Sequence, residues 1–319
     1  WAGGQAHRPA LLLIAVIGMA GVLSAFLVND TVCVMLAPLV AEIVLAMKRK
    51  VEPYLIALAM ASNAGSVATI TGNPQNIVIG SVSHIPYTDF AVALAPVAVV
   101  SLAIVAGAVL LFYRAEFRET RRLDAPPPQL VLHRWLLIKA LAATLGAVAA
   151  FFAGVPPAEA AIVAGALLLL TRRLKPQRIF AEIDWPLLLM FAGLFVVVRG
   201  LEQAAFTPAV LAAVHGLHLG RPAVLALVSA VLSNLVSNVP AVLLLKPFVP
   251  GLADPQRAWL VLAMASTLAG NFTIAGSVAN LIVVERARRL GVTISFWRHF
   301  RIGAPVTVLT ILLGVWMLG

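Results

Sequence analysis

The chain has 319 residues, of which 61% are hydrophobic and 11% charged, with a formal net charge of +10. A soluble domain has roughly 45–50% apolar and about 25% charged residues, so this composition excludes an ordinary soluble core. The single cysteine, Cys33, excludes an internal disulfide and a Cys-rich metal site.

The apolar residues form long runs that recur along the whole chain. Several runs approach or exceed the ~20 residues that a helix needs to cross a bilayer. They do not alternate as the strands of a membrane β-barrel would. We therefore predict an all-α, polytopic membrane protein whose main apolar runs are Ala10–Val28, Phe90–Phe112, Trp135–Phe152, Leu187–Val198 and Ile302–Leu318.

The positive charge is concentrated in four short loops. Most of the 23 Lys and Arg lie within residues 48–50, 114–134, 172–178 and 286–301. Short loops rich in Lys and Arg face the cytoplasm in membrane proteins. We interpret the charge as a marker of orientation in the bilayer and expect no nucleic-acid partner.

Two polar interruptions stand in the first third of the chain. Asn29-Asp30-Thr31 separates two apolar arms and predicts the tip of a re-entrant hairpin. The next helix, over residues 58–76, contains Gly72-Asn73-Pro74, which predicts a break. An unsatisfied backbone group costs several kcal/mol in hydrocarbon, so a break is tolerated only where protein or a water-filled cavity satisfies it.

The middle of the chain predicts a series of plain crossings. Residues 88–113 return the chain to the basic segment 114–134, and residues 135–153 and 157–171 form the next pair. Residues 185–202 cross again, and a shorter segment near 205–216 lies at the membrane surface. A second hairpin, a second broken helix and a last crossing over 299–318 complete the chain.

The second hairpin and broken helix repeat the first. Residues 58–76 match residues 262–280 at nine of nineteen positions without a gap, a shift of 204. The hairpins match at a shift of 209, which pairs Ser24 with Ser233, Asn29 with Asn238 and Pro38 with Pro247.

The loop charges give the two copies opposite orientations in the membrane. The loop after the first hairpin holds Lys48, Arg49 and Lys50, whereas residues 251–256 after the second hairpin hold none. Inverted repeats with interrupted helices are typical of secondary transporters, whose site lies at the midplane between the repeats. We expect a first repeat over residues 1–113, a cytoplasmic basic linker over 114–134 and a second repeat over 135–319. We also expect several N-terminal helices of the parent protein to precede Trp1.

The polar residues of the tips and breaks are the candidate site. Short amides, hydroxyls and half-helix N-termini hold anions, and freed carbonyls hold cations. We predict the coupling-ion ligands Asp30, Thr69, Gly72 and Gly276, with a Na⁺ ion near Asn29 and Asp30. The predicted solute ligands are Asn29, Thr31, Ser62, Asn63, Asn73, Asn76, Ser237, Asn238, Asn271, Thr273 and Asn280.

Simpler interpretations exist for some of these residues. Ser62, Gly65 and Ser66 are small enough to serve only as helix contacts. Asp30 is an ionisable group inside a membrane segment, which favours binding of Na⁺ or a proton. It could also cap a helix that starts at Val32, and both roles are compatible. The second repeat has Val239 in its place, so the two tips differ chemically.

At these motifs the chain resembles the ion transporter superfamily, which includes arsenite permeases, NhaD-type Na⁺/H⁺ antiporters, citrate transporters and divalent anion/Na⁺ symporters. The arsenite/citrate branch of bacterial anion permeases is the most similar. The residues that carry the resemblance are Asn29-Asp30-Thr31 with Pro38, Ser62–Gly65, Gly72–Asn76, Ser233–Pro240, Asp184-Trp185 and Phe191–Phe195.

The resemblance implies a scaffold subdomain and a mobile transport subdomain, often within a homodimer. It also implies that the latter holds both hairpins and both broken helices. The divalent-anion branch has Ser-Asn-Thr at both tips, whereas this chain has Asn-Asp-Thr and Ser-Asn-Val. This departure weakens the case for dicarboxylates and for a fixed Na⁺ stoichiometry.

We therefore expect a transporter of a small anion across the bacterial inner membrane. It would be coupled to Na⁺ or H⁺ and need no other cofactor. The alternatives are an arsenite or antimonite efflux permease and a Na⁺/H⁺ antiporter, because Asp30 repels free anions and suits a cation or a neutral hydroxide. A membrane-embedded enzyme would need a catalytic cluster, which the isolated Asp30 and the scattered histidines do not supply. A scaffold or receptor that transports nothing is disfavoured by polar residues at both tips and both breaks.

Overall fold

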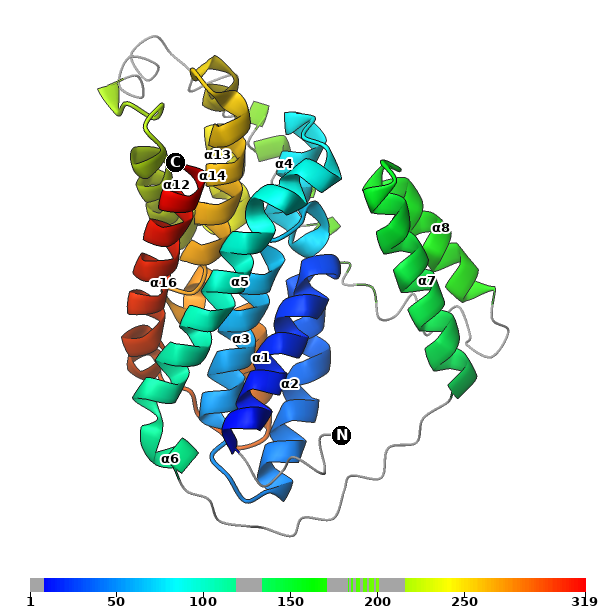
Figure 1. Cartoon of the computed structure of the whole chain (residues 1–319), viewed down its shortest axis with the longest axis vertical. Helices are drawn as coiled ribbons and strands as arrows, with labels where there is room; N and C mark the ends of the chain where they lie inside the picture. Colours follow the sequence, from blue (N-terminus) through cyan, green and yellow to red (C-terminus); the bar gives the residue numbers. More distant parts are fainter. Residues whose placement is uncertain are drawn as a thin grey trace. The chain divides into compact units, whose positions relative to one another are not determined.

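The computed structural model describes residues 9–118, 134–170 and 216–319, together with single positions between 183 and 200. Within these residues the regular structure is helical, which confirms the predicted all-α class (Figure 1). The chain divides into two compact units. Unit one comprises residues 1–85, 89–128 and 217–319, and unit two comprises residues 86–88 and 129–216.

The first hairpin and broken helix form the N-terminal part of unit one. The hairpin and the broken helix are followed by one long crossing and a short helix at its end. Their bounds are α1 Pro9–Phe26, α2 Asn29–Ala46, α3 Glu52–Ser66, η1 Ile70–Gly72, α4 Pro74–Ser83, α5 Tyr87–Phe112 and α6 Arg114–Arg118.

The C-terminal part of unit one has the same order of elements. Its bounds are α12 Pro222–Val236, α13 Asn238–Leu245, η2 Lys246–Gly251, α14 Pro255–Ala269, η3 Ile274–Gly276, α15 Val278–Arg289 and α16 Phe296–Leu318. Both predicted broken helices are therefore confirmed, and each break contains a single turn of 3₁₀ helix.

Helices α3 and α14 form the centre of unit one. Nearly every residue of α3 is buried, and α14 is buried from Ala258 to its end. Each is covered by the hairpin of its own repeat, α1 and α2 on α3 and α12 and α13 on α14. Figure 1 shows α1 and α2 at one edge of the bundle and α12 and α16 at the other.

The central helices run in opposite directions. Glu52, at the start of α3, accepts a hydrogen bond from Arg298 at the start of α16, with an Oε2–Nη1 distance of 2.6 Å. Arg257, in the first turn of α14, lies beside Gly319 at the other end of α16. Because α3 and α14 start at opposite ends of α16, the repeats are inverted, as the loop charges predict.

The described basic loops gather at one end of unit one. Arg49, between α2 and α3, pairs with Glu116 of α6 through an Nη1–Oε1 distance of 3.5 Å, and both side chains are buried. The Glu52–Arg298 pair joins the starts of α3 and α16 at this end. This is the end that the charge pattern assigns to the cytoplasm.

The crossings lie close to the predicted ranges. Five described helices are long and apolar enough to span a bilayer. Three of them, α5, α7 (Arg134–Phe152) and α16, are predicted crossings, and the other two, α1 and α2, are the arms of the first hairpin. In unit two, α7 packs against α8 (Pro157–Leu169). Many apolar side chains of these two helices are exposed, including Leu141, Leu145 and Ile162, as expected of helices that face lipid. The chain is an integral membrane protein.

Several predictions fall outside the described residues. These are the basic loop over 172–178, most of the linker over 114–134, the surface segment near 205–216, and most of the Asp184-Trp185 and Phe191–Phe195 motif. The division into repeats at residues 113 and 135 stays a prediction.

A close helix crossing joins α1 to α3. A Cβ atom on Gly65 would lie 2.2 Å from the carbonyl oxygen of Gly21, so only glycine lets the two backbones approach this closely. In this structure Gly65 therefore serves as a helix contact, the simpler of the two roles considered for it.

We predict that Gly65→Val separates α1 from α3 and lowers the free energy of unfolding. Overpacking typically costs about 1–3 kcal/mol, and a clash with backbone places this variant at the upper end. Thermal unfolding of the purified protein in detergent would measure the loss. Gly18→Val is the matched control, because Gly18 lies on α1 and a Cβ atom added there would have no neighbour within 4 Å. Equal stability of the two variants would contradict the crossing.

Candidate functional site

The two helix breaks have the same backbone geometry. Thr69 and Thr273, which directly precede the two 3₁₀ turns, are extended with φ of −139° and −129°. Asn73 and Ser277 are extended with φ of −157° and −147°, and their side chains cap α4 and α15. The sequence match at a shift of 204 is therefore a match in conformation.

An asparagine closes each break. In the first repeat, Nδ2 of Asn76 donates to the carbonyl of Ser66 at 3.1 Å and to that of Thr69 at 3.0 Å. These carbonyls belong to the segment where the helix is interrupted. The amide therefore replaces hydrogen bonds that a continuous helix would make along its own backbone.

The second repeat uses the same device 204 residues later. Nδ2 of Asn280 donates to the carbonyl of Gly270 at 2.7 Å and to that of Thr273 at 2.9 Å. We expected such freed carbonyls to face a coupling ion. Four of them instead accept from amides in this structure, so Asn76 and Asn280 hold the breaks together.

The predicted residues Gly72 and Gly276 are sites of close approach. A Cβ on Gly72 would lie 2.2 Å from the carbonyl oxygen of Ser66, and one on Gly276 would lie 3.0 Å from that of Gly270. Ser66 and Gly270 are themselves a repeat pair. Glycine therefore lets the 3₁₀ turn fold back on the end of the preceding half-helix.

Asn63 of α3 joins the first hairpin to the second break. Its Oδ1 accepts from Nδ2 of Asn29 at 2.9 Å and from Oγ of Ser277 at 3.0 Å. Its Nδ2 donates to Oδ1 of Asn271 at 2.9 Å and to Oδ1 of Asn280 at 3.3 Å. The structure thus brings four of the predicted solute ligands, Asn29, Asn63, Asn271 and Asn280, into one buried cluster.

Thr267, the counterpart of Asn63, makes the reciprocal connection. Its Oγ1 accepts from Nδ2 of Asn73 at 3.2 Å and from Nε2 of Gln75 at 3.0 Å. Position 63 of the first repeat therefore bonds to the second break, and position 267 of the second repeat bonds to the first break. The two repeats hold each other's interrupted helices.

Each hairpin tip is also bonded to the break of its own repeat. Oγ1 of Thr69 donates to the carbonyl of Ala25 near the end of α1. Thr273, its counterpart, donates to Oδ1 of Asn234 near the end of α12 at 3.4 Å. Positions 25 and 234 are themselves related by the shift of 209.

Within the part of the chain that the structure describes, buried oxygen atoms without a hydrogen-bond partner occur at matching places on the two hairpins. They are Oγ of Ser24 and Oδ1 of Asn29 in the first hairpin, and Oγ of Ser233 and Oδ1 of Asn238 in the second. Oδ1 of Asn76 is also without a partner. Buried polar groups are nearly always bonded, so a repeated exception at both tips is a feature of the site.

Other predicted residues lie apart from the buried cluster. Thr31 and Ser237 are exposed, and Ser237 has a left-handed φ of 79° at the turn between α12 and α13. Ser62 is buried and bonded to the carbonyl of Ala59 and to Cys33, with an Sγ–Oγ distance of 3.0 Å. Its contacts lie within the helix packing.

Asp30 lies in the first turn of α2 and is half-buried. The helix starts at Asn29 rather than at Val32, so the expectation that Asp30 caps a helix from Val32 is wrong. A carboxylate in the first turn still interacts favourably with the helix dipole.

Gln75, Asn234, Thr267 and Ser277 also bond within the site, although they were not among the predicted ligands. Thr267 and Ser277 stand at repeat positions opposite Asn63 and Asn73, so extending the comparison beyond identical residues would have found them. His299 is a further unpredicted residue, and its Nε2 lies 3.1 Å from the carbonyl oxygen of Asn271. Nothing in the spacing of the histidines indicated this contact.

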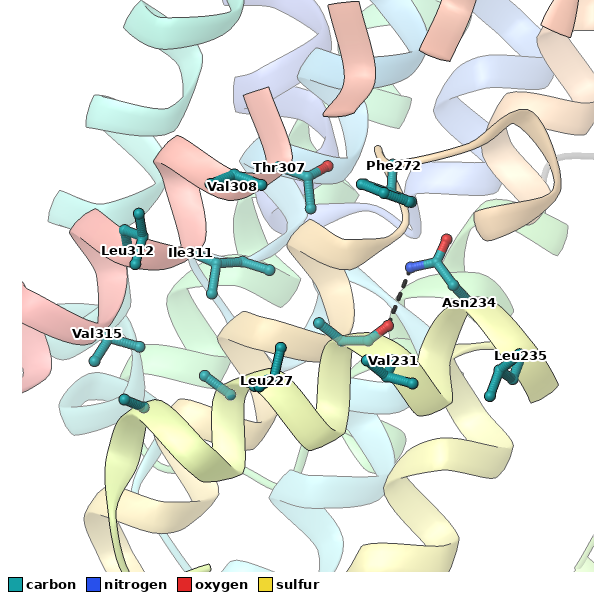
Figure 2. A pocket seen from close by; sticks show the side chains of 13 residues that line it. Leu227, Val231, Asn234, Leu235, Phe272, Thr307, Val308, Ile311, Leu312 and Val315 are labelled. Carbon is teal, nitrogen blue, oxygen red and sulfur yellow. Dashed lines mark hydrogen bonds between the residues drawn. The ribbon is translucent and has the colours of Figure 1, made fainter. Parts of the chain in front are cut away.

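A separate apolar pocket of about 540 Å³ lies between α12 and α16 (Figure 2). Leu227 and Val231 line it from one helix, and Val308 and Leu312 line it from the other. Asn234 lies at its edge and donates to the carbonyl of Ala230 (Figure 2). None of the predicted solute ligands lines this pocket, although Asn234, which accepts from Thr273 at the second break, does.

Comparison with known proteins now identifies the family. Residues 3–269 match the model of the citrate transporter family. The chain belongs to the citrate transporter family. The resemblance of the hairpin and break motifs to the ion transporter superfamily is thereby confirmed.

Relatives of this citrate transporter family member carry several names. This chain is 29% identical to a 46 kDa membrane protein of Mycobacterium leprae, and the match covers 98% of this chain and 78% of the relative. It is 30% identical to the silicon efflux transporter LSI3 of Oryza sativa subsp. japonica, over 97% and 78%. A putative transporter of Dictyostelium discoideum, arsB, is 37% identical over 52% of this chain and 30% of its own length. The family and these names show a transporter rather than an enzyme.

We predict that Asn76→Leu destabilises unit one. The substitution keeps the size of the side chain but removes the donor to Ser66 and Thr69, and an unsatisfied buried group costs about 1–3 kcal/mol. Asn280→Leu should have a similar effect because it removes the same bonds in the second repeat. The midpoint of thermal unfolding in detergent is the measurement. Gln256→Leu, at an exposed position on α14, is the control. Equal stability of all three variants would contradict a stabilising role for the Asn76 and Asn280 hydrogen bonds.

Proposed function

We propose that this protein is an ion-coupled secondary transporter of a small anion, driven by Na⁺ or H⁺. The bacterial inner membrane and a homodimer are the setting that we propose for it. Family membership supports transport, and the inverted repeats support an alternating mechanism about a midplane site. Unit one, which holds both hairpins and both broken helices, would carry the site.

The coupling ion is the part of the proposal that the structure supports most directly. Partnerless oxygens of Ser24 and Asn29 at one tip, and of Ser233 and Asn238 at the other, are hard ligands of the kind that bind alkali and alkaline-earth cations. A cation at a tip would satisfy buried atoms that the protein alone leaves unbonded. Asp30 adds negative charge at the first tip, where the second has Val239. The first tip is therefore the stronger candidate for Na⁺ or for a proton.

Helix N-termini support an anion as the solute. Helices α2 and α13 start at the hairpin tips, and α4 and α15 start at the breaks. Helix α2 packs against α15, and α13 packs against α4, so each tip lies beside the half-helix of the other repeat. The positive ends of helix dipoles and their free N–H groups bind anions. No Lys or Arg occurs in residues 24–31, 62–76, 233–240 or 266–280, so these groups would act without a salt bridge.

A neutral hydroxide is the second candidate solute. Asp30 is the single charged residue in the same four segments, and its negative charge repels free anions. The relatives include a protein named as a silicon efflux transporter and one named arsB. A site rich in amides and hydroxyls, with no basic side chain in these segments, suits silicic acid or arsenite.

Solid-supported-membrane currents from the full-length protein in liposomes would test the proposal. The panel is citrate, phosphate, arsenite, silicic acid and Na⁺ alone, each with and without Na⁺ and proton gradients. A current that needs both an anion and a cation gradient supports the proposal. A response to Na⁺ alone would assign the protein to the antiporters. Uncharged arsenite and silicic acid need a flux assay by inductively coupled plasma mass spectrometry, and their export with every anion silent would favour the hydroxide.

We predict that Asp30→Asn abolishes the dependence on the cation gradient while the protein still folds and inserts. The amide keeps the size of the side chain but removes the charge and the proton-binding group. Glu42→Gln is the control because Glu42 is an exposed carboxylate elsewhere on α2. Uptake by Asp30→Asn that is still driven by the cation gradient would exclude Asp30 as the coupling residue.

A further inference from the structure

The last helix of each repeat aligns with the other at a shift of 209. Ala95-Pro96-Val97 in α5 corresponds to Ala304-Pro305-Val306 in α16. This alignment pairs Phe90 with His299 and Leu94 with Gly303. Phe90 and Leu94 are fully buried apolar side chains, so the first repeat has two apolar residues at the positions where the second has an imidazole and a glycine.

His299 and Gly303 act on one atom, the carbonyl oxygen of Asn271. Nε2 of His299 lies 3.1 Å from this oxygen, and the side chain is 2% exposed. A carbonyl only accepts hydrogen bonds, so Nε2 carries the proton and donates. Gly303, one turn further along α16, comes so close that a Cβ there would lie 2.2 Å from the same oxygen. The glycine therefore lets α16 reach the break, and the imidazole bonds to it.

The other carbonyls at the end of α14 also have side-chain donors. Thr307 of α16 donates to Leu268 at 3.4 Å, Asn234 donates to Ala269 at 3.0 Å, and Asn280 donates to Gly270 at 2.7 Å. His299 completes this series at Asn271. Helix α16 thus supplies two of the four donors that stabilise the interrupted end of α14.

The Asn271 side chain is held from the opposite direction. Its Oδ1 accepts from Asn63, and its Nδ2 donates to the carbonyl of Met60 at 3.2 Å. The backbone of this residue is therefore fixed by α16 and its side chain by α3. Through Asn63, the same chain of hydrogen bonds reaches Asn29 at the first hairpin tip.

We infer that His299 is a positioning residue for solute binding, which places Asn271 and the second break against Asn63 and the first hairpin tip. The inference rests on the proposed function, because it assigns the residue to the site where solute and coupling ion would bind. It concerns the second repeat alone, since Phe90 at the matching position of the first cannot donate a hydrogen bond. A loss of this bond should weaken binding while the bundle persists.

Three variants separate the hydrogen bond from general packing. His299→Phe introduces the residue of the first repeat and removes the donor while filling similar space. His299→Gln keeps an N–H donor at nearly the position of Nε2. Gly303→Ala disturbs the same carbonyl by a different route, because its Cβ would displace α16. His84→Asn is the control, since His84 is an exposed histidine at the left-handed end of α4, a conformation that asparagine adopts readily.

The first readout needs no transport. Amide hydrogen–deuterium exchange by mass spectrometry would be followed for residues 266–276 in the full-length protein in nanodiscs. Exchange there should rise in His299→Phe and Gly303→Ala and stay at the wild-type rate in His299→Gln and His84→Asn. Unchanged exchange in His299→Phe, or a rise in His299→Gln equal to that in His299→Phe, would overturn the inference.

The second readout is transport of citrate, with silicic acid and arsenite measured in parallel. For each probe that the wild type moves, His299→Phe should raise KM about ten-fold, with maximal flux per folded protein within about two-fold of wild type. His299→Gln should restore the wild-type KM. A fall in maximal flux at constant KM would show a structural role only and overturn the inference.

The two readouts distinguish the inference from the proposed function. If the wild type moves no probe, the proposed function fails for these solutes, and the exchange measurement still decides whether His299 holds the second break in place. If the wild type transports a probe and His299→Phe leaves both exchange and KM unchanged, the positioning role is wrong and the proposed function stands.

Discussion

The structure depends on one constraint, which is that backbone groups freed inside a bilayer must find partners. Interrupting α3 and α14 exposes carbonyls that water cannot reach in hydrocarbon. Asn76 and Asn280 bond to them within each repeat, and Asn63 and Thr267 join each repeat to the break of the other. The polar residues that interrupt the apolar runs are therefore needed, before any binding role, to satisfy the backbone at the helix breaks. A binding site can use only what this requirement leaves free.

Among the described residues, the oxygen atoms left without a partner near the site lie mostly at the hairpin tips, with one more on Asn76 at the first break. The amides of Asn63 and Asn73 are engaged with protein groups, whereas Asn29 and Asn238 each keep a buried oxygen without a partner. This division separates the residues that build the site from those that could bind to a transported species. The proposed coupling ion would therefore bind at the tips, where α2 and α13 begin, beside the hydrogen-bonded breaks.

Much of the fold could be predicted from the sequence, because bilayer thickness fixes helix length and because the repeat survives as identical residues. The breaks at Gly72 and Gly276 were predictable for the same reason. The partners of individual amides were not. Whether Asn76 faces a cavity or bonds to Ser66 depends on the backbone conformation of the break, which the spacing of residues in the sequence does not determine. The contact of His299 with Asn271 joins helices that the sequence alone does not place side by side.

The two repeats share the hydrogen bonds that close their helix breaks and differ in the ionisable residues around them. Asn76 and Asn280 match because each repeat must close its break in the same way. Asp30 of the first repeat aligns with Val239 of the second, and His299 of the second aligns with Phe90 of the first. The ionisable groups therefore occupy different positions in the two repeats. The carboxylate stands at the first tip and the imidazole behind the second break. Under the proposed function, this asymmetric chemistry on a symmetric frame would let the first repeat bind the coupling ion while the second positions the solute.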